Sequence, residues 1–186
     1  MSNFSVYLLL GLEHILNWAA LDHLLFILSL TCVYVVTDYK KLLWLVTAFT
    51  LGHSITLALA TLHIIQVNMA WVEFLIPCTI LLSAISNLIK TKQGYKYGVV
   101  AIFGLIHGLG FSNYLQSLLG AESSIFAPLL AFNIGLEVGQ IIVVSIILAS
   151  SIVSLHVLKW KQGAYIKVIS GITIGLVLPM ILERWP

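Results

Sequence analysis

Six apolar segments make up most of the chain, and their lengths constrain the fold more than any other feature of the sequence. Each reaches or exceeds the roughly 20 residues that an α-helix needs to cross about 30 Å of hydrocarbon. The chain is 60% hydrophobic and 9% charged, whereas soluble domains carry about a quarter charged residues. We therefore expect an all-α, polytopic transmembrane helical bundle whose partner is the lipid bilayer, one integral membrane domain over residues 1–186. The expected spans are residues 17–37, 42–63, 69–89, 97–118, 126–155 and 164–182.

Residues 4–16 are also apolar, and they are expected either to form a short half-helix or to lengthen the first span. All eight lysines lie at alternate connections, after the first, third and fifth spans. Positively charged connections face the cytoplasm, so the pattern predicts a multi-pass protein of the inner membrane with both termini outside. Arg184 alone falls on the other face. No nucleic-acid partner is expected.

Histidines and carboxylates lie within or beside the apolar segments, where an ionisable group is costly unless it is paired, neutral or bound. By the rise of about 1.5 Å per residue, His53, His107 and Glu137 lie roughly 15 Å deep, near the bilayer centre. Asp22, His23 and Glu73 are expected nearer the outer surface. The whole set lies in the outer half, which predicts a cavity or path open to the outside.

A divalent transition metal would suit these side chains. Imidazole and carboxylate groups bind Ni²⁺, Zn²⁺, Co²⁺ or Fe²⁺, and the two cysteines form no pair that indicates a thiolate site. Helical spacing puts further polar groups on the same faces, where they could orient the ligands. A proton relay, or structural hydrogen bonds between helices, could use the same residues. The expected ligands are Asp22, His23, His53, His107, Glu137 and His14, and the expected supporting residues are Ser54, Glu73, Asn133 and Gln140.

Glycines flank the central histidine in "FGLIHGLGF", residues 103–111. Gly104 and Gly108 would let another backbone approach closely and bring His107 within reach of ligands on other helices. Gly135 and Gly139 have the same spacing. Such glycine-rich faces could also join copies of the chain in a homo-oligomer. The sequence shows no convincing internal repeat.

Four stretches, "HILNWAALDHLLF", "TAFTLGHSITLALA", "FGLIHGLGF" and "FNIGLEVGQ", together resemble the HupE/UreJ family, more closely its second branch. The resemblance implies a small polytopic membrane protein that handles divalent metal, nickel first, as a permease or as an accessory factor for hydrogenase or urease. It places His14, Asp22, His23, His53, His107 and Glu137 on the family's polar motif positions.

The first of these stretches departs from the family pattern. Seven residues separate His14 from Asp22 where the family has five, which rotates His14 by about 200° on a straight helix. Either the helix breaks near Asn17 and Trp18, or His14 has left the cluster.

Three functions remain open, and a metal transporter or uptake factor is favoured over an enzyme. Weak, mixed imidazole and carboxylate ligands suit an ion that must be released. The alternative is an intramembrane metal-dependent hydrolase in which His23, His53 and His107 hold the metal and Glu137 or Glu73 acts as general base. A haem or copper redox protein is the third.

Overall fold

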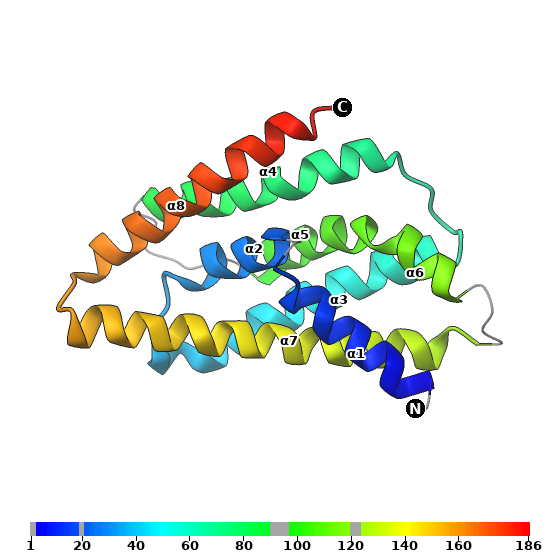
Figure 1. Ribbon diagram of the computed structural model, residues 1–186, viewed down its shortest axis with the longest axis horizontal. Helices are drawn as coiled ribbons and strands as arrows, with labels where there is room; N and C mark the ends of the chain where they lie inside the picture. Colours follow the sequence, from blue (N-terminus) through cyan, green and yellow to red (C-terminus); the bar gives the residue numbers. More distant parts are fainter. Residues whose placement is uncertain (1–2, 19–20, 90–96, 120–123) are drawn as a thin grey trace.

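Helices form nearly all of the part of the chain that the computed structural model describes, which is residues 3–18, 21–89, 97–119 and 124–186 (Figure 1). The predicted all-α bundle is confirmed. A single 3-10 turn, η1, covers Val36–Asp38, and a π-helical turn, η2, covers Val153–Val157. The α-helices are α1 (Asn3–Leu16), α2 (Leu21–Thr31), α3 (Tyr39–Thr61), α4 (Met69–Leu88), α5 (Tyr97–Gly110), α6 (Ser112–Leu119), α7 (Phe126–Ile152) and α8 (Gln162–Glu183).

Four helical stretches are long and apolar enough to cross a membrane by themselves: α3 with η1, α4, α7 with η2, and α8. Two further spans are counted only if each bent pair of helices is taken as one span. Helices α1 and α2 meet at 67°, and α5 and α6 meet at 53°. Counted in this way the bundle has six spans, the number that the sequence predicts.

The first span differs from the expectation for residues 17–37, because the helix breaks within that range. Helix α2 has only 11 residues, and α1 supplies the rest of the span before the bend. Asn17 follows α1 directly, and asparagine favours local hydrogen bonds over a helical backbone. The expected span at 97–118 is likewise interrupted, at Phe111. Gly108 and Gly110 precede that break, and glycine weakens a helix.

The chain runs back and forth between two ends of the bundle (Figure 1). We call the end where α2, α4 and α7 finish and α3, α5 and α8 begin the lysine end, and the opposite end the far end. Lys40, Lys41, Lys159 and Lys161 lie near the lysine end. The lysines at 90, 92 and 96 are outside the described residues. Helix α1 begins at the far end.

Glycines let two pairs of helices, α3 with α5 and α1 with α7, pack backbone against backbone. A Cβ added at Gly104 would overlap the carbonyl oxygen of Phe49, and one at Gly108 would overlap the carbonyl oxygen of His53. This confirms the close approach predicted for these two glycines. Any larger side chain would push α5 away from α3.

The second pair depends on glycines in both helices. A Cβ at Gly11 of α1 would overlap the carbonyl oxygen of Phe132, and one at Gly135 of α7 would overlap that of Leu8. Gly139 lies against Ile15. The glycine faces considered for a homo-oligomer therefore pack inside one chain, and an oligomer stays a prediction that needs another face.

Candidate metal centre

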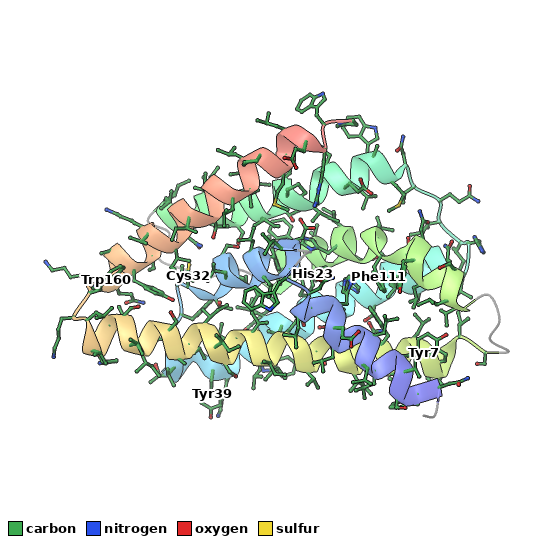
Figure 2. The ribbon with its side chains drawn as sticks, viewed as in Figure 1. Tyr7, His23, Cys32, Tyr39, Phe111 and Trp160 are labelled. Atoms are coloured by element: carbon green, nitrogen blue, oxygen red, sulfur yellow. The ribbon has the colours of Figure 1, made fainter. Side chains whose placement is uncertain are left out.

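Three imidazoles from three helices converge in the middle of the bundle. His14 lies in the last turn of α1, His23 in the first turn of α2 and His53 in α3, and one nitrogen from each lies within 4.8 Å of the others. The bend between α1 and α2 makes this possible, because it turns two histidines nine positions apart toward each other. Their ring centroids are 4.5 Å apart, and each lies 6.0 Å from the His53 ring. Figure 2 shows His23 in the middle of the bundle.

The helix break decides between the two possibilities given for His14, which were a broken helix or a position outside the cluster. The chain bends between the two histidines, so the two additional residues before Asp22 are absorbed at the break. His14 stays in the cluster. It is a member of the group of three, together with His23 and His53.

These histidines have nitrogens that lack a partner among the described residues. Both ring nitrogens of His23 and of His53, and Nε2 of His14, are buried without a hydrogen bond. The side chains of His23 and His53 are 6% and 0% exposed. Each unsatisfied buried polar group costs about 1–3 kcal/mol. The donor set therefore fits a metal ion, since an ion would satisfy one nitrogen on each ring.

The spacing of the nitrogens suits an ion after small movements. Metal–imidazole bonds of about 2 Å place tetrahedral ligand atoms roughly 3.3 Å apart. The three nitrogens lie within 4.8 Å of one another, so side-chain rotations of about an ångström would bring them to bonding distance.

His107 lies beside this group and is held by Thr79. The Nε2 atom of His107 is 3.0 Å from the Thr79 hydroxyl oxygen, and that hydroxyl also lies 2.7 Å from the carbonyl oxygen of Ile76. A hydroxyl has one proton. Because the Ile76 carbonyl can only accept, Thr79 donates to it and accepts from the N–H at Nε2 of His107.

This arrangement fixes the tautomer of the fourth histidine. With the proton on Nε2, the Nδ1 atom of His107 carries a lone pair, and it is buried without a partner among the described residues. The His107 ring is 1% exposed, and its centroid is 5.3 Å from that of His23. His107 is thus next to the three-histidine group with one nitrogen free to accept or to coordinate.

The two predicted carboxylate ligands, Asp22 and Glu137, have other partners, and Glu73, predicted as a supporting residue, is exposed. Asp22 forms an ion pair with Arg184 at 3.1 Å, which ties the start of α2 to the end of α8. Glu137 accepts a hydrogen bond of 2.7 Å from Thr47. Glu73 is exposed on α4. The structure therefore brings together the histidines of the predicted site and directs these three acidic residues to other partners or to the surface.

Of the predicted supporting residues, Gln140 joins α3 to α7. Gln140 accepts a 2.7 Å hydrogen bond from Thr50, and Ser54 donates to the backbone carbonyl of Thr50 in its own helix. Asn133 has a buried Oδ1 atom with no partner among the described residues. The supporting residue that sequence reasoning missed is Thr79. It lies in an apolar run of α4, and no spacing signal connects it to His107 in another helix.

An open cavity of about 680 Å³ touches the cluster at His14. Its lining comes from α1, the break after α1, and the start of α6, and it includes His14. Phe111 covers one side of this histidine, with ring centroids 4.1 Å apart. Whether this cavity is the path to the outside that the sequence predicts stays a prediction. The lining residues are Leu10, Glu13, His14, Leu16, Asn17, Trp18, Phe111 and Tyr114.

Aromatic side chains cover the other side of the cluster. The Phe26 ring lies 5.1 Å from the His107 ring and 4.8 Å from the ring of Phe49. Phe49 is also 5.2 Å from His107. Both phenylalanines are 1% exposed. The cluster therefore meets the cavity only at His14, and Phe26 of α2 and Phe49 of α3 cover it beside His107.

Comparison with known proteins identifies one family. The sequence model described as HupE / UreJ protein matches residues 1–184. No curated protein and no solved structure matches the chain.

Proposed function

The chain belongs to the HupE/UreJ family, and we propose that it carries a divalent transition-metal ion, nickel first, through the membrane. The observation that supports this most directly is the convergence of His14, His23 and His53 on one buried point. Imidazole is a good ligand for Ni²⁺, Co²⁺, Zn²⁺ and Fe²⁺. Without thiolates the ion would be held loosely enough to leave again.

The two broken helices support transport over catalysis. Binding sites of secondary transporters lie near the bilayer midplane and are typically formed by discontinuous helices. Here His14 and His23 lie on either side of the first break, and His107 lies four residues before the second, at Phe111. A bend within the membrane leaves helix ends and backbone groups beside the ion.

We propose that the lysine end faces the cytoplasm of the inner membrane and that the cavity opens outside. The alternate placement of the lysines supports this orientation. Reporter fusions would test it. A C-terminal alkaline phosphatase should be active and a C-terminal green fluorescent protein dark, and the reverse result would invert the proposed direction.

Metal titration of the purified protein tests the site. Wild-type protein should bind one Ni²⁺ or Co²⁺ per chain. The variants His14→Ala, His23→Ala and His53→Ala should each weaken binding by more than the roughly 10–100-fold that loss of an outer supporting group costs. His156→Ala is the matched control, because His156 is exposed in η2. Equal affinity in all five proteins would remove the cluster from the function.

A metalloenzyme remains the second candidate because of the cavity. A hydrated ion needs only about 200 Å³, at about 30 Å³ per water, whereas the cavity holds about 680 Å³. Three ligands with an open position are typical of catalytic zinc sites. Glu13 lines the same cavity as His14 and would be the candidate general base there, in place of Glu137 or Glu73.

Two measurements separate these functions. Metal that exchanges on dialysis, together with uptake into liposomes, supports the carrier. Metal that stays bound, with no uptake, supports the enzyme. An absorption spectrum of the same sample would detect a Soret band if the protein held haem, and elemental analysis would detect copper.

A further inference from the structure

The bundle consists of two halves that repeat one arrangement of helices. A bent pair, α1–α2, is followed by two long helices, α3 and α4. A second bent pair, α5–α6, is followed by α7 and α8. Because each half has an odd number of spans, three, the chain enters the second half from the opposite end of the bundle. The second half is therefore inverted relative to the first. The sequence alone predicted no repeat, and the structure corrects that expectation through the contacts between helices.

The contacts of the glycines correspond one to one. Gly104 of α5 lies against the carbonyl oxygen of Phe49 and the amide nitrogen of His53. Gly11 of α1 lies against the carbonyl oxygen of Phe132 and the amide nitrogen of Leu136. Counterpart residues are separated by a fixed number of positions in the sequence. A residue of α5 lies 93 positions after its counterpart in α1, and a residue of α7 lies 83 positions after its counterpart in α3.

A second set of contacts has the same two offsets. Gly52 of α3 lies against the carbonyl oxygen of Ala101 and the amide nitrogen of Leu105. Its counterpart, Gly135 of α7, lies against the same atoms of Leu8 and Leu12. Two independent contacts that share both offsets identify an approximate two-fold relation between the halves.

Short stretches of sequence follow the same alignment. "LGLEH" at residues 10–14 matches "FGLIH" at 103–107, and "AFTLGHS" at 48–54 matches "AFNIGLE" at 131–137. His14 and His107 are therefore counterparts. Each histidine lies beside a phenylalanine, and the two phenylalanines are also counterparts. The ring centroids of His14 and Phe132 are 5.7 Å apart, and those of His107 and Phe49 are 5.2 Å apart. His53 matches Leu136, so the metal site itself is asymmetric.

The two counterpart histidines differ in access. His14 lines the open cavity between α1 and α6. The corresponding space lies between α5 and α2, and there Phe26 packs on His107 and on Phe103, whose ring centroid is 5.9 Å away. Both histidines have an aromatic ring against them, but His14 and its neighbour Phe111 line a cavity, whereas His107 and Phe26 are each 1% exposed.

We propose that the two halves exchange conformations, and that this exchange opens a second route to the cluster from the lysine end, between α2 and α5. The inference rests on the proposed carrier function. In the second conformer Phe26 leaves its place, the space between α1 and α6 closes, and His107 lines the route in the way His14 does here. Inverted repeats with a site at their interface are built for such alternating access.

Thiol labelling tests the second route without any transport assay. Two single-cysteine proteins are made from a variant lacking Cys32 and Cys78. One carries Leu10→Cys and the other carries Phe103→Cys, at counterpart positions of the two halves. A membrane-impermeant maleimide is applied to sealed vesicles of known orientation, with and without Ni²⁺. We expect Leu10→Cys to react only from the far-end side and Phe103→Cys only from the lysine-end side. Added Ni²⁺ should change the two rates in opposite directions by at least two-fold.

Lys161→Cys is the control, because Lys161 is exposed at the lysine end, directly before α8. Its rate should not respond to Ni²⁺. A Phe103→Cys protein that never reacts from the lysine-end side, or two rates that rise and fall together, would overturn the inference.

A reversible lock provides the second arm. Phe26→Cys and Phe103→Cys, combined in one protein, are joined by a short bifunctional thiosulfonate and released with dithiothreitol. The locked protein should bind Ni²⁺ with unchanged affinity but lose at least ten-fold of its uptake rate into liposomes, and release should restore uptake. Undiminished uptake by fully cross-linked protein would refute the second route. Absence of uptake in wild type would refute the carrier function and leave the labelling result to decide the inference.

Discussion

Substitution of Gly11 by alanine tests whether backbone packing, and not only ligand identity, makes the metal site. Gly11 lies one turn before His14 in α1, and a Cβ there would overlap the carbonyl oxygen of Phe132. Ordinary contact between such atoms begins near 3.4 Å. The helices α1 and α7 must therefore separate by roughly 1 Å or more to accommodate one methyl group.

The expected effect on binding follows from the tolerance of metal–ligand bonds. Bond lengths in protein metal sites vary by only about 0.2 Å, so a shift of about 1 Å away from the cluster roughly doubles the movement that His14 must make to reach bonding distance. We expect the dissociation constant for Ni²⁺ to rise by about 10–100-fold, as it does when a ligand loses the partner that orients it. Overpacking should also lower the free energy of unfolding by about 1–3 kcal/mol.

Competition with a chromophoric chelator would give the dissociation constant, and a thermal melt in detergent would report stability. Gly175→Ala in α8 is the matched control, because a Cβ at Gly175 meets nothing within 4 Å. It should leave both quantities nearly unchanged. Wild-type affinity and melting temperature in Gly11→Ala, or the same losses in the control, would show that close packing does not set the position of His14.

Three further outcomes are expected. Thr79→Val should lower the free energy of unfolding by about 1–3 kcal/mol, because it leaves the N–H of His107 unsatisfied. Thr79→Ser keeps the hydroxyl and should retain most of the wild-type stability in a thermal melt. Equal losses in the two variants would count against the hydrogen bond. A double-mutant cycle of Asp22→Asn with Arg184→Gln should give a coupling of about 1–2 kcal/mol in chemical denaturation, and additivity would show that the ion pair contributes nothing. Ni²⁺ affinity should fall as pH is lowered below neutral, since protons compete for the same ring nitrogens; a titration series that shows no change with pH would argue against imidazole ligands.

The approximate positions of the helices, and a count of six spans if each bent pair is one span, were predictable because they depend on local properties. Hydrocarbon must be crossed by helices of a minimum length, and apolar runs of that length are visible in the sequence. Alternate lysines gave the same count independently. The two bends were harder to locate. The departure of the "HILNWAALDHLLF" stretch from the family spacing indicated the first, near Asn17, and nothing comparable indicated the second.

The candidate site was predictable in its residue types and only partly in its members. The expected cluster contained His14, His23, His53 and His107, and these do lie together. Asp22 and Glu137 were expected beside them because they are costly in hydrocarbon. The free-energy cost of burying a carboxylate predicts that it has a partner, but it does not predict which residue that partner is. Here the partners are Arg184 for Asp22 and Thr47 for Glu137.

Sequence by itself determined that this chain belongs in a membrane, has apolar segments for up to six spans and carries imidazoles within them, because each of these follows from how single side chains partition between water and lipid. Tertiary structure alone decided which imidazoles meet, which acids are diverted and that the two halves are inverted copies. Those outcomes depend on distances between residues far apart in the chain, and the repeat resides mainly in backbone contacts that only a few scattered residues record.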